Sequence, residues 1–194
     1  MPFSADLPCI ETPRLLLRPF VRADAPVVRQ LAGAREIADT TLLIPHPYPE
    51  GAAEQWISTH ADDWKARRGL ALAITVRGGG ELVGAIGLTF SEEHSRGELG
   101  YWVGLPYWRN GFATEATTAL IDFAFRALGL NRVQAHHFAR NPASGRVLLK
   151  AGLHREGASP RALRKHGRFE DVVFYGILRR DWPGLRGSAA PFPG

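Results

Sequence analysis

The sequence has few of the features that define several common protein classes. Cys9 is the only cysteine among 194 residues, so no intrachain disulfide can form and no zinc site built on paired cysteines is possible. No segment approaches the roughly 20 apolar residues that span a bilayer, and residues 1–14 lack a basic stretch followed by an apolar run. We therefore expect a soluble, cytoplasmic protein. The length and the 45% hydrophobic content predict one domain.

Long runs of a single charge are also missing. The net charge of +5 is spread along the chain among acidic residues, and only residues 154–168 are locally basic. That segment is typical of a solvated surface turn. Neither an arginine-rich arm nor an interleaved basic and aromatic pattern is present, which disfavours a nucleic acid or a membrane surface as a partner.

What the sequence does contain is a series of strands and helices. Alternating or short apolar segments predict strands over residues 12–20, 70–77, 82–90, 97–104, 131–139 and 169–179. Helical spacing of apolar residues predicts helices after the capping residue Asp24, near residues 52–67, and over residues 113–130 and 143–153. Three prolines make residues 40–52 a loop.

The most informative segment is GYWVGLPYWRNGFATEA, residues 100–116. A strand and a proline turn lead into a helix whose first residues are small, including Gly111 and Ala113. Unpaired N–H groups and the positive end of the helix dipole bind phosphate at such a helix start. In the alternative interpretation, Thr114 or Asn110 only caps the helix and Glu115 stabilises its first turn.

A second segment, NPASGRVLLKAGL at residues 141–153, follows the next strand. Together the two segments resemble the GNAT N-acetyltransferases, in which WRNGFA (108–113) matches the glycine and the final small residue of the phosphate loop. Trp108 replaces the usual Gln or Arg, as in the RimJ/RimL-like branch, which this chain also resembles in ELGYWV and DVVFYGILRRDW. The resemblance covers residues 11–182 and leaves a flexible tail at residues 183–194.

The resemblance implies an α/β (α+β) fold with a mixed, mostly antiparallel sheet of about six or seven strands and about four helices. It implies acetyl-CoA as cosubstrate and no metal. Backbone groups of Trp102 and Val103 would lie along the pantetheine and acetyl group, and Asn141 would bind the pantetheine arm unless it only forms an Asn-Pro turn. The expected cofactor contacts are Trp102, Val103, Trp108, Arg109, Asn110, Gly111, Phe112, Ala113, Thr114, Asn141, Ser144 and Arg146.

Acetyl transfer to an amine needs a base for the amine, a donor for the oxyanion and a proton for the thiolate. The resemblance implies a backbone N–H of Trp102 or Val103 as the oxyanion donor and Ser144 as the group at the sulfur, although Ser144 also suits a helix cap. Glu98 is the candidate base, since partial burial would raise its pKa; pairing with Arg96 is the alternative. His136 and His137 point to opposite faces of a strand, so only one can face the cleft.

The acceptor amine is expected opposite the cofactor, between the proline-rich loop at residues 45–49 and a hairpin at residues 159–169. The resemblance implies a protein N-terminus or a small amine, and the basic segment 154–168 favours an acidic or anionic acceptor. A monomer or a homodimer is expected. A non-catalytic acyl-CoA-binding module remains the alternative function, whereas a Rossmann site is disfavoured because WRNGFA lacks the G-x-G-x-x-G spacing.

Overall fold

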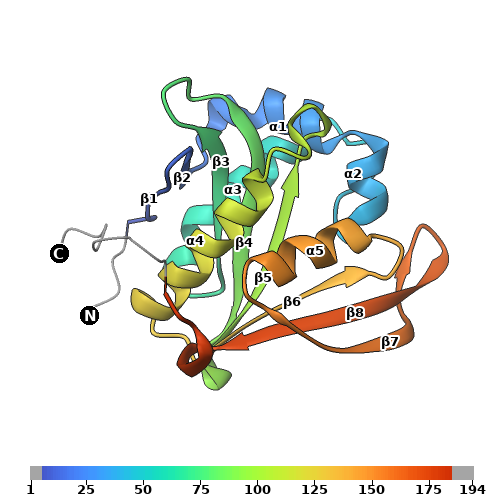
Figure 1. Ribbon diagram of the computed structural model, residues 1–194. Coiled ribbons are helices and arrows are strands. Elements are labelled where there is room, and N and C mark those ends of the chain that lie inside the picture. Colours follow the sequence, from blue (N-terminus) through green and yellow to red (C-terminus); the bar gives the residue numbers. More distant parts are fainter. Residues whose placement is uncertain (1–5, 185–194) are drawn as a thin grey trace.

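The computed structural model describes residues 6–184, which form one sheet with helices on both faces (Figure 1). The helices are α1 (Ala25–Ala32), α2 (Arg35–Thr40), α3 (Ala52–Lys65), α4 (Phe112–Arg126) and α5 (Pro142–Lys150). The strands are β1 (Ile10–Glu11), β2 (Leu15–Pro19), β3 (Gly69–Val76), β4 (Leu82–Ser91), β5 (Arg96–Val103), β6 (Arg132–Phe138), β7 (His154–Lys165) and β8 (Arg168–Leu178).

The eight strands have the order β1-β2-β3-β4-β5-β6-β8-β7. All neighbours are antiparallel except β5 and β6, which are parallel and pair only from Arg96 with Arg132 to Glu98 with Gln134. Helix α4 connects these two strands, as a parallel crossover requires. The sheet thus consists of two antiparallel parts that meet along one short parallel contact.

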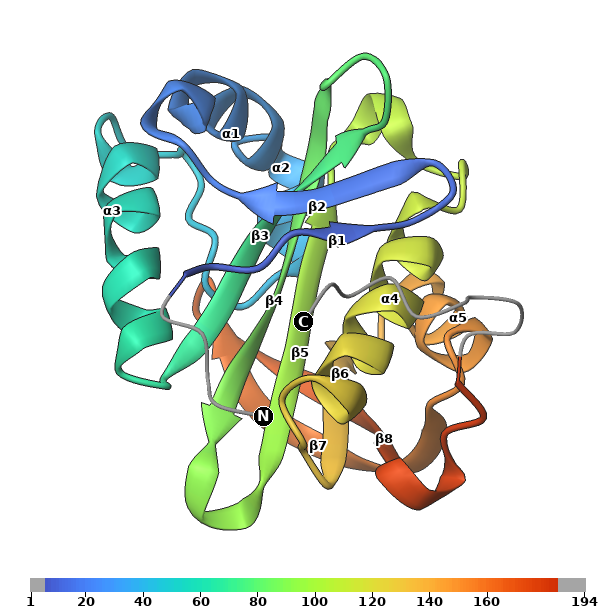
Figure 2. The same cartoon turned by 90° about the vertical axis from the view of Figure 1, so that its left-hand side faces the viewer.

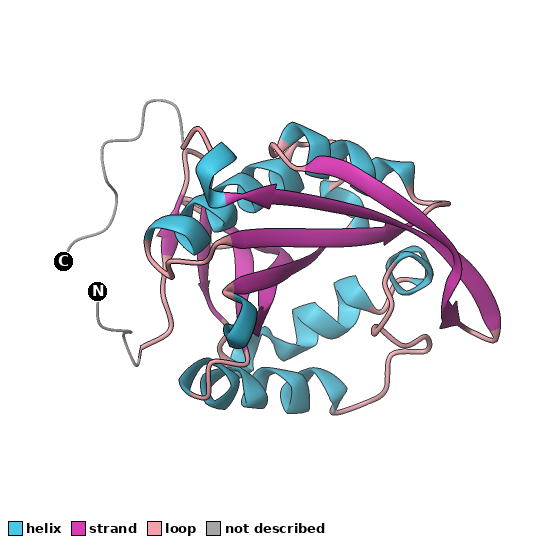
Figure 3. Cartoon of the chain, turned by 90° about the horizontal axis from the view of Figure 1, so that it is seen from below, coloured by secondary structure: helices cyan, strands magenta, loops and turns pink. Residues whose placement is uncertain are grey.

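Each face of the sheet has its own helices and its own apolar core. On one face α4 lies beside α5, and buried residues such as Leu120 and Phe125 pack on the inward side chains of β5 and β6. On the other face α1 and α3 pack together over Ala85 and Trp102. Figures 2 and 3 show these two helical layers from the side and from below.

Most of the expected elements are present, and the mixed, mostly antiparallel fold is confirmed. The sequence analysis missed β1 and α2, and it was wrong to expect only a surface turn at residues 154–168, because residues 154–165 form β7. The hairpin expected at residues 159–169 is confirmed, since β7 and β8 are joined there by a tight turn. That strand is basic and exposed on most of its length, so it has no apolar alternation to reveal it. Apart from Pro183 and Gly184, the tail expected at residues 183–194 lies outside the described residues.

Asp24 occupies the N-cap position of α1 but makes no side-chain cap bond to that helix. Its carboxylate instead accepts two hydrogen bonds from the Arg18 guanidinium, both at 2.8 Å, and one from the Val21 N–H at 2.9 Å. The carboxylate therefore fixes the turn before α1 to β2.

Candidate active site

Beyond their short paired segment, β5 and β6 are no longer joined as neighbouring strands, and we call this separation the gap. Their ladder ends at Glu98 and Gln134, whereas β5 continues to Val103 and β6 to Phe138. The Gly104 N–H donates to Val83 O at 2.8 Å on β4, and alternate residues of a strand direct their N–H groups to the same side. The N–H of Trp102 therefore faces β4, whereas those of Tyr101 and Val103 face the gap.

The start of α4 lies at the carboxyl end of β5, beside this gap. Gly111 is the N-cap with φ +79°, a left-handed conformation that favours glycine. The first helical hydrogen bond runs from the Glu115 N–H to Gly111 O at 3.0 Å. The preceding N–H groups of Phe112, Ala113 and Thr114 have no acceptor within the helix, so they are available to an anion.

Neither side chain considered as a cap for α4 caps it. The helix has no side-chain cap bond, and the Asn110 amide donates backwards to Tyr107 O at 3.2 Å and Trp108 O at 3.3 Å. A Cβ on Gly111 would meet only the Arg14 guanidinium, at 3.4 Å. The helix start is therefore uncrowded, and no group within residues 6–184 accepts from its first N–H groups.

A charged cluster holds the loop before α4 against the turn between β1 and β2. Glu115 accepts hydrogen bonds of 2.6 Å from both the Thr12 hydroxyl and Arg14 Nε, and Arg14 Nη1 donates to Asn110 O at 3.0 Å. Although burial alone would raise the pKa of the Glu115 carboxyl, these donors lower it. The carboxylate thus stays ionised in the first turn, where it complements the helix dipole.

The Trp108 side chain lies at the end of the gap, whereas an arginine at this position could reach outwards as a cationic ligand. Its indole N–H donates to Val103 O at 2.6 Å and thereby uses the carbonyl that β6 leaves unpaired. This contact explains how tryptophan can replace the Gln or Arg expected at this position. The indole thus ties the loop before α4 to the end of β5.

The start of α5 lies across the gap from β5. The Asn141 Oδ1 atom is the cap and accepts the Ser144 N–H at 3.3 Å. The Ser144 hydroxyl lies 2.8 Å from the Tyr101 hydroxyl, which comes from β5. Burial raises the pKa of Tyr101 to about 12, so this phenol stays protonated at neutral pH. Sequence reasoning predicted a role for Ser144 and did not consider Tyr101.

A glycine lets α5 approach the sheet closely. A Cβ on Gly145 would lie 2.7 Å from both His137 Nε2 and the Tyr175 hydroxyl. His137 is buried, with Nδ1 2.8 Å from Phe138 O and Nε2 3.3 Å from the Tyr175 hydroxyl. His137 therefore supports α5, and Gly145 sets the height of Ser144 above the gap.

Glu98 and His136 form a pair on the opposite face of the sheet. His136 Nδ1 lies 2.8 Å from Glu98 Oε1, and the Gln134 amide donates to Glu98 Oε2 at 3.1 Å. We expected burial to raise the pKa of Glu98, and this was wrong. The hydrogen bond from His136, with that from Gln134, outweighs burial and lowers the pKa. His136 and His137 face opposite sides of the sheet, as expected.

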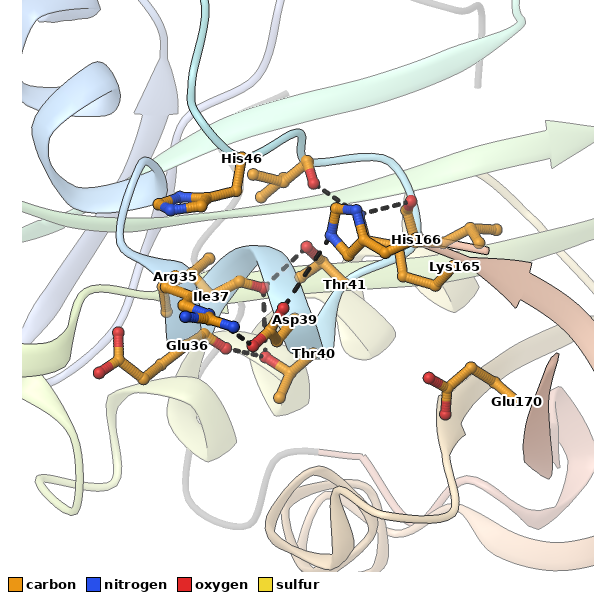
Figure 4. A network of polar contacts seen from close by, with 12 residues as sticks. Arg35, Glu36, Ile37, Asp39, Thr40, Thr41, His46, Lys165, His166 and Glu170 are labelled. Atoms are coloured by element: carbon orange, nitrogen blue, oxygen red, sulfur yellow. Dashed lines mark hydrogen bonds and ion pairs between the residues drawn. The ribbon is translucent and has the colours of Figure 1, made fainter. Parts of the chain in front are cut away.

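The β7–β8 hairpin contacts the loop after α2 (Figure 4). Lys165 Nζ donates to Leu42 O at 3.0 Å and to Ile44 O at 2.6 Å, and His166 Nε2 lies 4.0 Å from Asp39 Oδ1. Burial lowers the pKa of Lys165. These contacts join the proline-rich loop to the hairpin, and we call the surface that the two segments form together the wall.

The residues around the gap match the parts of coenzyme A. The N–H groups at the start of α4 suit a pyrophosphate, and the Val103 N–H, which faces the gap, suits a carbonyl of an amide-containing arm. Arg146 is exposed on α5. Among residues 6–184 no group of three or more His, Cys, Asp or Glu side chains is placed to hold a metal ion. No helix in the same range is long and apolar enough to cross a membrane.

Comparisons with known proteins define the class. Residues 14–154 match the family described as an acetyltransferase (GNAT) domain. The uncharacterized N-acetyltransferase YoaA of Bacillus subtilis is 34% identical over 89% of this chain and 97% of its own length. The [ribosomal protein uS5]-alanine N-acetyltransferase of Escherichia coli is 32% identical over 44% of this chain and 45% of its own.

The fold has solved counterparts with bound coenzyme. Mycobacterium smegmatis RimJ in complex with CoA-disulfide superimposes with a TM-score of 0.78 over 87% of this chain and 84% of its own, at 24% identity. The chain belongs to the GNAT acetyltransferase family, and its homologues include RimJ-like enzymes.

Proposed function

We propose that this acetyltransferase transfers the acetyl group of acetyl-CoA to a primary amine by direct attack in a ternary complex. The observation that carries the proposal is the gap between β5 and β6, which has a helix start on each side. Acetyl-CoA supplies the activated acetyl group as a thioester. The chain supplies binding groups on one face of the gap and proton-carrying side chains on both.

The donor would be held mostly by backbone atoms. The pyrophosphate would accept hydrogen bonds from N–H groups at the start of α4, from Arg109 to Thr114, with Gly111 allowing close approach. The pantetheine arm would run beside Val103 and the free amide nitrogen of Asn141. The Val103 N–H faces the gap and is the donor we assign to the developing oxyanion.

Ser144 would protonate or steady the leaving thiolate. Tyr101 stays protonated, and its single hydrogen has two acceptors at Ser144, the Oγ atom at 2.8 Å and the backbone oxygen at 3.3 Å. When it donates to the nearer Oγ, the serine hydrogen is free to point at sulfur. Tyr101 acts through Ser144 and is a positioning residue. The amine would be deprotonated on the opposite face, where Glu98 and His136 lie.

An acidic peptide N-terminus is the acceptor class that the charges favour. The β7–β8 hairpin carries Arg161, Arg164 and Arg168, and within residues 6–184 none of their guanidinium groups pairs with a carboxylate. Arg161 and Arg164 instead lie over the exposed Phe169 ring, at 4.9 and 5.8 Å. The homologues that act on ribosomal-protein alanine also favour a peptide, in the bacterial cytoplasm.

The test incubates the protein with acetyl-CoA and a panel of small amines and peptides, and follows the release of free thiol. We expect release with at least one amine, fastest with a peptide that has acidic residues after its N-terminus. A non-catalytic acyl-CoA-binding module would bind coenzyme A by calorimetry and release no thiol with any amine of the panel.

A further inference from the structure

We propose that the imidazole of His136, not the carboxylate of Glu98, accepts the proton of the acceptor amine, and that Glu98 orients this imidazole. The inference rests on the proposed function and assigns its base. Glu98 is then a positioning residue, and His136 Nε2 is the atom that contacts the substrate.

Four side chains in addition to His136 form a hydrogen-bonded chain across the acceptor face of the sheet. Glu156 on β7 pairs with Arg132 on β6, and Arg132 Nε donates to Gln134 Oε1 at 3.3 Å. Since the Gln134 oxygen is occupied by a donor, its amide nitrogen must be the atom that faces Glu98, at 3.1 Å. The network thus fixes the orientation of the Glu98 carboxylate.

This hydrogen-bonded network occupies both oxygens of the Glu98 carboxylate. One accepts from Gln134 and the other from His136 Nδ1, at 2.8 Å. The same hydrogen bonds lower the pKa of the carboxyl, which makes it a weaker base than an ordinary glutamate. A carboxylate that is held in this way is suited to orient a neighbour rather than to take a proton from an amine.

The same contacts leave His136 Nε2 as the unpartnered basic atom of the pair. A neutral imidazole that donates from Nδ1 carries its lone pair on Nε2. The His136 side chain is 27% exposed, its ring lies against Phe174 at a centroid distance of 6.0 Å, and no contact to Nε2 is found within residues 6–184. The Glu98 carboxylate and the His136 imidazole are thus arranged like the carboxylate and histidine of a catalytic triad, in which Nδ1 contacts the carboxylate and Nε2 is the base.

The face of β5 beyond Glu98 is uncrowded, which suits the approach of an amine. Gly100 lies between Glu98 and Trp102 on the same face of β5, is exposed, and would place a Cβ in open space. Glu98 is the charged member of the Glu98–His136 pair. The charged groups around this pair are Arg96 on β5, Arg132 on β6 and Glu156 on β7, and Phe174 contributes an uncharged ring from β8.

The proton balance assigns one proton to each face. An ammonium group and a thioester become an amide, a thiol and one free proton. His136 Nε2 takes the first ammonium proton before the C–N bond forms and releases it to water. Ser144 gives its hydroxyl proton to sulfur when the C–S bond breaks. The second ammonium proton leaves the nitrogen after attack and restores the Ser144 hydroxyl.

The test compares His136→Asn, Glu98→Gln and the control His94→Asn, which alters an exposed turn residue. Asparagine keeps an N–H near the position of Nδ1 but has no base at Nε2. We expect His136→Asn to lower kcat/KM for a peptide acceptor about 100-fold, to remove its decline on the acid side, and to leave KM for acetyl-CoA unchanged. Glu98→Gln should cost less and keep an acid-side decline, and His94→Asn should match wild type.

A second readout needs no turnover. Long-range ¹H–¹⁵N spectra of the free protein should show His136 protonated at Nδ1 and not at Nε2 in its neutral form, and Glu98→Gln should weaken that preference. The opposite tautomer would overturn the inference, as would an acid-side decline that survives in His136→Asn and vanishes in Glu98→Gln. If wild type binds coenzyme A but releases no thiol with any amine, the proposed function fails instead, whatever the tautomer.

Discussion

The two faces of the β5–β6 gap are built from different kinds of contact. On the α4 and α5 face, the candidate donor site consists of backbone N–H groups and of side chains that belong to two short segments, residues 100–116 and 141–153. On the opposite face, the candidate acceptor site consists of side chains from β5, β6, β7 and β8 and of backbone carbonyls from the loop after α2. One face depends on local sequence, and the other depends on how distant strands are placed.

The largest expected effect on the donor face comes from removing the Ser144 hydroxyl. Ser144→Ala should lower kcat about 100-fold because the thiolate loses its proton donor, with KM for acetyl-CoA within about twofold. Tyr101→Phe should lower kcat less, and the double variant should resemble Ser144→Ala, since Tyr101 acts through Ser144. Steady-state kinetics of the three variants measure this, and additive losses would contradict the contact.

Acid should destabilise the helical layer of the acceptor face. His60 on α3 is buried against Phe20 and Trp56, and neither ring nitrogen has a hydrogen-bond partner within residues 6–184. Burial lowers the pKa of His60 from 6.5 to about 4. The unfolded chain therefore binds the proton first, so stability is complete above pH 6.5 and is lost as the pH falls towards 4. The loss should reach about 3 kcal/mol.

Urea unfolding at several pH values checks this expectation. His60→Phe removes the titrating group and should flatten the dependence of the unfolding free energy on pH in that window. The idea would be wrong if wild type and His60→Phe lost the same free energy between pH 6.5 and pH 4.

Close packing under α5 predicts a smaller effect on stability. Gly145→Ala places a methyl group 2.7 Å from His137 Nε2 and the Tyr175 hydroxyl, so it should destabilise the protein by about 1–3 kcal/mol. Gly157→Ala is the matched control, because its Cβ meets nothing within 4 Å. Denaturant unfolding should separate the two variants, and equal midpoints would contradict the packing.

The smallest expected effect concerns the exposed arginines of the hairpin. Replacing Arg161 and Arg164 by glutamate should raise KM for an acidic peptide several-fold and leave KM for acetyl-CoA unchanged, because exposed ion pairs contribute about 0.2–1 kcal/mol each. The difference should shrink at high salt. An equal rise for acidic and neutral peptides would remove charge as the reason.

The same contrast explains what could be predicted from sequence. The start of α4 was predictable because a strand, a turn with Pro106 and Gly111 are adjacent in the chain, and Ser144 belongs to a recognisable segment. Tyr101 was not predictable as its partner, since nothing local shows that the start of α5 faces β5 across the gap. The lowered pKa of Glu98 depends on His136, 38 positions further along, and on Gln134.

β7 was missed for a related physical reason. Its exposed, charged side chains lack alternation, and only its ladder with β8 makes it a strand. The wall formed by Lys165 with Leu42 and Ile44 brings together residues more than 120 positions apart. Sequence patterns reveal local backbone geometry well and long-range side-chain placement poorly.

The central claim is that coenzyme A binds at the start of α4, and a pair of matched glycines tests it. Gly111 and Gly51 are both helix N-caps in the left-handed region, with φ +79° and +75°, but Gly51 begins α3 on the other face. Calorimetry with coenzyme A should show at least tenfold weaker binding for Gly111→Val and unchanged binding for Gly51→Val, although both substitutions strain the backbone similarly. Equal affinities for the two variants would contradict the account.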